Sequence, residues 1–233
     1  MTVWQKISDF AGAVGDAGGG LLGDLAHVFG LEGNGGAPER DVAFTIGVVA
    51  LSAKMAKADG VVSPLEVDAF NKVFQARTAE AENVARVFKL AKQDVAGYEA
   101  YADEIAKLLK DDRKLLQDVL EGLLHVAAAD GVLHPKEDAY LADVTARFGF
   151  SPSEYRFFRA RFINDGCNPY DVLKLSPAAT DPEVKAQHRK LVVDNHPDKL
   201  MGRGVPAEFV EIATRKLAAI NAAYDTIAKE RGL

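Results

Sequence analysis

Cysteine is nearly absent: Cys167 is the single cysteine in this chain of 233 residues. One thiol cannot form an intrachain disulfide, and it excludes a zinc site built from paired cysteines. No residue that would activate the thiol is evident from the sequence, so we assign Cys167 no catalytic role. The composition suits a reducing compartment.

Long apolar runs are also missing. The longest uncharged stretch, residues 42–53, has 12 residues, whereas a membrane-spanning helix needs about 20 apolar residues. We therefore interpret this stretch as a buried helix. The N-terminus has no basic start followed by a continuous apolar segment, which a signal peptide would have. These features predict a cytoplasmic protein.

An excess of basic residues is lacking as well. The formal net charge is −6, which argues against nucleic-acid binding because phosphates are neutralised by clustered Lys and Arg. From Asn168 onward, 10 Lys and Arg residues stand against 9 Asp and Glu residues, and the preceding part holds 18 against 25. This contrast predicts an acidic part and a nearly neutral part with different roles.

Motifs typical of enzymes are absent. No nucleophile is recognisably paired with a base, and the glycine run at residues 18–20 lacks the Lys-Ser/Thr that would complete a phosphate-binding loop. We expect the chain not to be an enzyme. We expect no cofactor either, a divalent cation being the only one that its motifs suggest.

Residues 1–38 form the first predicted segment, which contains many glycines. Residues 1–30 carry apolar side chains at helical spacing around a glycine break. One hypothesis is that they contact a membrane surface, which would place the protein at the periphery of the inner membrane. Their polar side is acidic, which suits an anionic membrane poorly. The other hypothesis is a loosely docked terminus, followed by a flexible linker at residues 32–38.

Residues 39–164 form the second predicted domain, which we expect to be helical throughout. Apolar residues recur at spacings of three and four, without the alternation typical of strands. Ser151 and Glu154 form a capping box at a helix start, and Gly149 stands where the preceding helix should end. The predicted helices cover residues 40–58, 64–77, 79–93, 98–110, 112–129, 135–147 and 152–163.

An internal repeat lies within this domain. Residues 56–66 read AKADGVVSPLE, and residues 127–137 read AAADGVLHPKE. Each copy joins a long apolar helix to a second helix through an Asp-Gly turn. Two such helix pairs predict a pseudo-symmetric bundle.

The two Asp-Gly turns allow two interpretations. Like a calcium-binding EF-hand loop, each copy has Gly and Glu six residues apart, but it lacks oxygen ligands at the first and third positions. An EF-hand is therefore not expected, although the turns could share one cation if they converge. The candidate ligands are Asp59, Glu66, Asp130 and Glu137. We favour the structural interpretation, in which Asp-Gly makes the turn and Glu caps the next helix.

The helical pattern and the paired Ala-Asp-Gly-Val turns resemble the TerB family of small, acidic, all-helical domains, over roughly residues 40–163. TerB-like domains are associated with tellurite-resistance and stress systems, and some are proposed to bind metal. The resemblance extends that proposal only to the four carboxylates of the two turns.

Residues 165–233 form the third predicted domain. Thr180 and Glu183 form a capping box at the start of a helix expected over residues 181–195, which Pro197 should end. A glycine-containing loop leads to a longer helix, expected over residues 206–229, with apolar residues along one face.

The helix at residues 181–195 has two distinct faces when its residues are placed about 100° apart. The inner face, toward the longer helix, holds Val184, His188, Leu191 and Asn195. The outer side holds Lys185, Arg189 and Lys190. One face thus packs inward, while the other presents a positive stripe.

A basic helix that ends at His196-Pro197-Asp198 and packs against an amphipathic helix resembles the J-domain, over essentially the whole segment from residue 168. Together with the TerB-like region, it resembles the DjlA-type J-proteins. The fold so predicted is all-α, a TerB-like helical bundle followed by a small J-domain built on an antiparallel helical hairpin.

The resemblance implies a co-chaperone that activates a DnaK-type ATPase. The residues implied to bind that partner are His196, Pro197, Asp198, Lys185, Arg189, Lys190 and Lys199. The TerB-like domain would bring the partner to a client that the sequence does not identify. The alternative is a stress- or metal-sensing interaction module in which the J-domain is a scaffold.

The chain departs from the J-domain pattern at several positions. His188 and Asn195 stand where J-domains usually have tyrosine, and Lys174 stands where they usually have glycine. Asp194 lies beside the basic stripe and should weaken it. These departures bear on affinity and partner choice more than on the fold.

Overall fold

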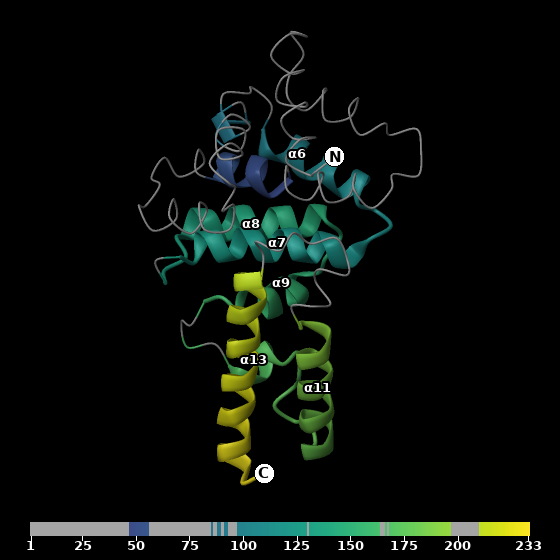
Figure 1. Ribbon diagram of the computed structural model, residues 1–233, viewed down its shortest axis with the longest axis vertical. Helices are drawn as coiled ribbons and strands as arrows, with labels where there is room; N and C mark the ends of the chain where they lie inside the picture. Colours follow the sequence, from purple (N-terminus) through teal and green to yellow (C-terminus); the bar gives the residue numbers. More distant parts are fainter. Residues whose placement is uncertain are drawn as a thin grey trace.

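The computed structural model describes residues 47–55, 85, 88–89, 91–92, 97–129, 131–163, 166, 168–196 and 210–233. These residues form helices and turns, with no strand among them, so the predicted all-α class is confirmed. After a helical stretch at 47–55, the helices are α6 (Tyr98–Leu108), α7 (Arg113–Ala127), α8 (Pro135–Arg147), α9 (Pro152–Arg159), α10 (Pro169–Val172), α11 (Asp181–Asp194) and α13 (Val210–Arg231). Figure 1 shows α6 to α9 stacked in layers, with α11 and α13 extending from them side by side.

The helix ends follow local signals in the sequence. Ser151 and Glu154 form the predicted capping box of α9, and His134 and Glu137 form another at α8. Gly149 follows α8 with a φ of 77°, in the left-handed region that glycine adopts without strain. Helix α8 therefore has its predicted bounds.

Helix α9 is shorter than predicted. It was expected to reach residue 163, but it ends at Arg159. The chain then tightens into a turn in which the Phe162 amide donates to the Arg159 carbonyl at 2.9 Å. The apolar spacing continues through this turn because Phe162 and Ile163 still face the core, so periodicity alone did not reveal the helix end.

Helix α7 lies at the centre of the first hydrophobic core, where residues 118–128 are all buried. Helix α8 packs against α6, α7 and α9. The Tyr140 hydroxyl of α8 donates to the Leu51 carbonyl at 2.8 Å, which ties the helical stretch at 47–55 to the bundle. Burial of each large apolar side chain here contributes about 1.5–3 kcal/mol.

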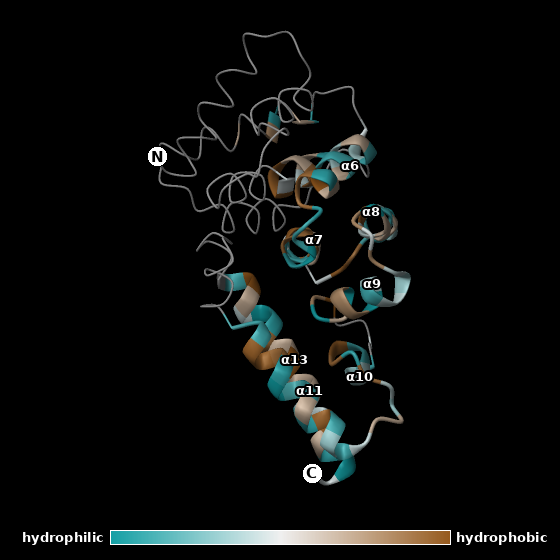
Figure 2. Cartoon of the chain, turned by 90° about the vertical axis from the view of Figure 1, so that its right-hand side faces the viewer, coloured by the Kyte–Doolittle hydropathy of each residue, from teal (hydrophilic) through white to brown (hydrophobic). Residues whose placement is uncertain are grey.

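A second, smaller core joins α10, α11 and α13. It contains Val184 and Leu191 from α11, and Ile220 and Ile227 from α13. Figure 2 shows hydrophobic and hydrophilic residues alternating along α13, as expected for an amphipathic helix. The predicted pairing of two helices in this region is confirmed.

Helix α13 also contributes to the first core. Ile212 and Ala213 pack into the first core, whereas Ile220 packs into the second. One helix therefore spans the contact between the two parts of the chain. Within the described residues, no helix combines the length and the apolar character needed to cross a membrane.

Candidate partner-binding site

The candidate site is built on α11. The Glu183 carboxylate accepts hydrogen bonds from the Thr180 amide at 2.7 Å and the Thr180 hydroxyl at 2.8 Å, which secures the start of the helix. At the other end Asn195 is buried, and its side-chain amide donates to the Leu191 carbonyl at 2.7 Å. The buried Asn195 side chain thus anchors the last turn of α11, directly before His196.

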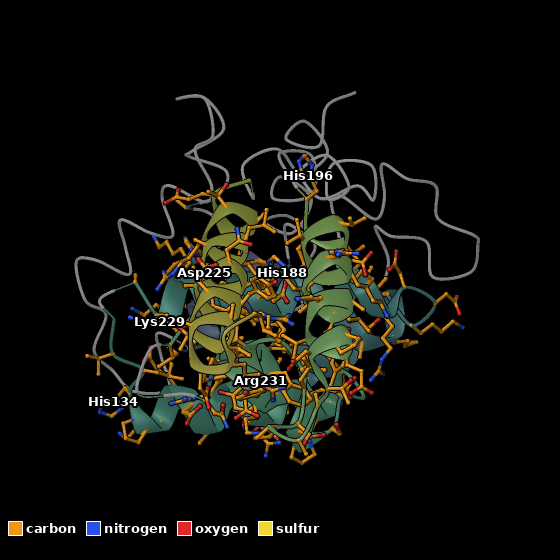
Figure 3. All side chains as sticks on the ribbon, turned by 90° about the horizontal axis from the view of Figure 1, so that it is seen from below. His134, His188, His196, Asp225, Lys229 and Arg231 are labelled. Atoms are coloured by element: carbon orange, nitrogen blue, oxygen red, sulfur yellow. The ribbon has the colours of Figure 1, made fainter. Side chains whose placement is uncertain are left out.

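The inner face of α11 packs on α13 as predicted. Val184, Leu191 and Asn195 are buried. His188 stacks on Tyr224 of α13 with ring centroids 4.1 Å apart and planes 10° apart, and its Nε2 lies 2.9 Å from Asn221 Oδ1. Figure 3 shows His188 between the two helices. At a position where J-domains usually have tyrosine, His188 still provides a planar ring that stacks on α13, and its ring nitrogen adds a polar contact with Asn221.

The outer side of α11 carries the basic stripe, formed by Lys185, Arg189 and Lys190. Arg189 and Lys190 are exposed, and Lys185 is half-buried. Among the described residues, none of these three side chains forms an ion pair with a carboxylate. This side of α11 is therefore positively charged within the part of the chain that the structure describes.

His196 follows the end of α11 and is exposed. Figure 3 shows it beyond the helix end, away from the inner face that holds His188. Pro197, Asp198 and Lys199 lie outside the described residues. Of the His196-Pro197-Asp198 motif, the structure therefore describes His196 alone, which lies at the end of the basic stripe.

Val193 is a surface residue of α11 that the sequence analysis missed. It is 55% exposed, and at about 100° per residue it lies between Arg189 and Lys190 around the helix. The sequence did contain a signal for it, since Val193 is an apolar residue on the otherwise charged outer side of the predicted helix. Its exposure adds an apolar contact point to the stripe.

The sequence alone did not predict the structural role of Arg231. From the last turn of α13 its guanidinium donates to the Tyr170 hydroxyl at 2.7 Å and to the Ala179 and Pro177 carbonyls at 2.6 and 2.8 Å. It thereby holds the loop before α11 against the end of α13. These contacts fix the position of the basic stripe relative to the second core.

The structure describes part of one Asp-Gly turn. Gly131 has a φ of 85°, as the predicted tight turn requires, and the Glu137 carboxylate accepts from the His134 amide at 3.1 Å as a helix cap. Asp59, Glu66 and Asp130 lie outside the described residues. Within the part of the chain that is described, no group of three or more His, Cys, Asp or Glu side chains is arranged to hold a metal.

Three buried charges join the two parts of the chain. The Lys216 ammonium of α13 donates to the Glu121 carboxylate of α7, and Arg161 Nη1 lies 3.7 Å from the same carboxylate. Burial alone would raise the pKa of Glu121, but Lys216, Lys114 and Arg161 together lower it to about 2. The carboxylate is therefore ionised throughout the physiological range.

A neighbouring arginine strengthens this junction. Arg215 Nη2 donates to the Ala128 and Phe162 carbonyls, both at 3.1 Å. These carbonyls stand at the ends of α7 and of the turn after α9. Buried carbonyls need donors: Arg215 adds a second donor to the Ala128 carbonyl, which also accepts from the Gly131 amide at 3.1 Å, and supplies a donor to the Phe162 carbonyl.

The chain is similar to known proteins over most of its length. A family model described as tellurite resistance protein TerB matches residues 45–160, and one described as DnaJ domain matches residues 168–231. A protein named Co-chaperone protein DjlA from Photobacterium profundum is 30% identical, over 83% of this chain and 80% of the relative. A protein of that name from Coxiella burnetii is 32% identical, over 77% of this chain and 74% of the relative. No solved structure matches the chain.

Proposed function

Because this chain belongs to the DjlA-type J-domain proteins, we propose that it is a co-chaperone that stimulates ATP hydrolysis by a DnaK-type chaperone. His196, Pro197 and Asp198 would contact the partner, and the TerB-like bundle would direct the complex to a client. The name of the relatives supports the co-chaperone role.

The observation that carries this proposal is the unpaired stripe on α11. Lys185, Arg189 and Lys190 have no ion pair among the described residues, and they lead to an exposed His196. Surface ion pairs contribute little to stability, and three cations on one side of a helix form a patch whose charge complements an acidic surface. Their availability favours an external acidic surface.

The physical role of the stripe would be electrostatic steering. Complementary charge accelerates encounter and orients the partners, with modest affinity that decreases as salt increases. Asp198 could then accept a charge-assisted hydrogen bond from an arginine of the partner. The hydrolytic chemistry would belong to the partner.

The targeting role would depend on the junction between the two parts. Lys216 and Arg215 attach α13 to the bundle, so a client bound by the bundle would stand at a constant position relative to α11. Such an arrangement supplies proximity between client and chaperone.

The decisive experiment compares the full chain with a His196→Gln variant in an ATPase assay with the DnaK-type partner. We expect stimulation to be abolished while the helical content and melting temperature stay the same, because His196 is exposed. His134→Asn is the matched control, since it replaces another exposed histidine and keeps a side chain that can cap α8.

The control should stimulate like the natural chain. If His196→Gln stimulated equally well, the proposal would be wrong, and the alternative of a sensing module with a scaffold J-domain would gain support.

A further inference from the structure

A polar cavity lies between the bundle and the J-domain. Its volume is about 370 Å³, and its walls come from α7, α11, the turn after α9 and the turn after α10. Small-molecule sites usually enclose about 300–1,000 Å³. The side chains that line it with nitrogen donors are Lys114, Gln117, Arg161, Lys174, Gln187, Lys190 and Asn195. The three amides already donate to groups of the chain, so the four cations are the donors left for a ligand.

Positive charge exceeds negative charge around this cavity. The cations are Lys114, Arg161, Lys174 and Lys190 in its walls, and Lys216 behind them on Glu121. The carboxylates are Asp194 in the wall, Asp118 beside Lys114 at 3.4 Å, and Glu121. Five cations against three carboxylates leave a surplus of two positive charges.

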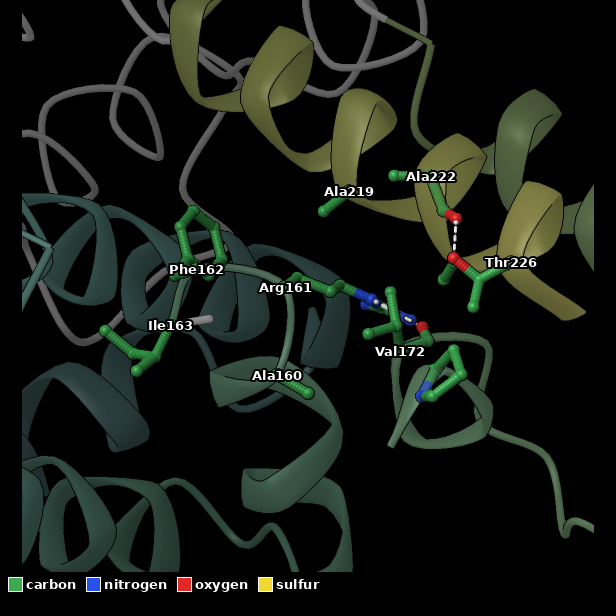
Figure 4. A pocket seen from close by; sticks show the side chains of 10 residues that line it. Ala160, Arg161, Phe162, Ile163, Val172, Ala219, Ala222 and Thr226 are labelled. Carbon is green, nitrogen blue, oxygen red and sulfur yellow. Dashed lines mark hydrogen bonds between the residues drawn. The ribbon is translucent and has the colours of Figure 1, made fainter. Parts of the chain in front are cut away.

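Arg161 is the most deeply buried of the cations in the cavity wall. Its side chain is 1% exposed, its Nε donates to the Val172 carbonyl at 3.2 Å, and its Nη2 has no hydrogen-bond partner among the described residues. Figure 4 shows Arg161 reaching toward Val172, beside a second hollow whose walls include Ala219 and Ala222. The Thr226 hydroxyl in that hollow donates to the Ala222 carbonyl and is not a hydrogen-bond partner of Arg161 Nη2. A buried donor without a partner is costly, so a ligand oxygen would stabilise it.

Lys174 is held in the wall under strain. Its φ of 56° lies in the left-handed region, which costs a residue with a Cβ on the order of 1 kcal/mol. Its ammonium lies 4.7 Å from the centre of the Phe158 ring and forms no ion pair with any described carboxylate. Burial, and then Arg161, lower the pKa of Lys174 to about 8. Strain of this kind is typical of functional sites.

We propose that this cavity binds a phosphate group, with Arg161 and Lys174 as its principal ligands and Lys114 and Lys190 at its edge. A phosphate group carries a charge of about −1.5 to −2 at pH 7 and three strong acceptor oxygens, which matches the charge surplus and the unsatisfied guanidinium. Arginine and lysine are the side chains that recognise phosphate. The site lies between the bundle and the J-domain, and its occupation does not depend on the proposed action on the DnaK-type partner.

The test is calorimetric titration of the full chain with inorganic phosphate at constant ionic strength, comparing Lys174→Gly with the natural chain. Glycine suits the φ of 56°, so the variant should fold with an unchanged or higher melting temperature. We expect its phosphate affinity to fall about tenfold, because one charged hydrogen-bond donor is lost.

Two further variants make the result specific. Lys174→Arg should retain phosphate binding, since it preserves the cation. Lys136→Gln, at an exposed position of α8, removes one positive charge elsewhere and should bind phosphate like the natural chain. Equal binding by Lys174→Gly and the natural chain would overturn the site.

The phosphate could belong to a free metabolite or to a lipid headgroup. Vesicles with and without phosphatidic acid, mixed with the same variants, distinguish these sources. Lys174-dependent binding of free phosphate supports a soluble ligand, and Lys174-dependent binding of phosphatidic acid vesicles alone supports a lipid. If neither phosphate nor vesicles bind in a Lys174-dependent way, the proposal is wrong.

Discussion

Lys216 of α13 and Glu121 of α7 form a buried ion pair at the contact between the J-domain and the bundle. The two side chains are 1% and 2% exposed and stand 95 residues apart in the chain. Removing one member of a buried pair leaves an uncompensated charge, which usually costs more than the pair itself contributes.

We therefore predict that Lys216→Met destabilises the chain by about 3–5 kcal/mol, measured as the free energy of unfolding in urea. Lys229→Met is the control on the same helix, because Lys229 is exposed, and it should change stability little. The double variant Glu121→Leu/Lys216→Met should be less unstable than the sum of its single variants, because neither member of the pair is left without the other, while Arg161 loses its neighbouring carboxylate. A double variant as unstable as the sum of its single variants would show that the pair is not coupled as described.

His125 should make stability depend on pH. It is buried in α7, edge-on to Phe162, and burial, followed by the charge of Arg215, lowers its pKa to about 4 from 6.5. Between these values the unfolded chain takes up a proton that the folded chain does not. The contribution of His125 is therefore complete above pH 6.5 and is lost as the pH falls toward 4.

Urea unfolding between pH 7.5 and 4.5 should reveal this loss, up to about 3 kcal/mol. Glu121 contributes little above about pH 5.5, since its carboxylate stays ionised in the folded chain and the unfolded chain protonates it only near its ordinary pKa of 4.5. His125→Gln should flatten the profile, whereas His134→Asn, at an exposed histidine, should not. An equally steep profile in the His125→Gln variant would assign the titration to another group.

The features that the sequence predicted well depend on neighbours along the chain. The capping box of Ser151 and Glu154 spans three residues, and the glycine that ends α8 acts within one turn, so both can be read directly. The inner and outer faces of α11 follow from helical periodicity alone. These local signals were enough to propose the partner-binding stripe.

The features that were missed depend on residues far apart in sequence. Lys216 and Arg231 look like ordinary surface cations, and only the fold brings them to Glu121 and to the loop before α11. The cavity around Arg161 likewise combines residues of four separate segments. Lys174 was noticed as a departure from the usual glycine, but its left-handed backbone became evident only in the structure.

The basic stripe makes the proposed stimulation depend on salt. Arg189 is exposed and has no ion pair among the described residues, so its replacement should affect the partner complex more than the fold. We predict that Arg189→Gln raises the chain concentration needed for half-maximal ATPase stimulation several-fold at low salt. The difference should shrink as ionic strength rises, because charges beyond about 10 Å are screened at 0.1 M salt. Lys136→Gln, on α8, is the charge-matched control.

Val193 should contribute to the same complex through a different force. Its side chain is 55% exposed between Arg189 and Lys190, and burial of exposed apolar surface in a complex is favourable at about 25 cal/mol per Å². We predict that Val193→Ser raises the half-maximal concentration by roughly three- to tenfold with no loss of melting temperature. Because apolar burial does not depend on charge screening, this effect should persist at the ionic strength that masks Arg189→Gln. A Val193→Ser effect that disappeared with salt would mean that Val193 lies outside the contact and acts only through the neighbouring charges.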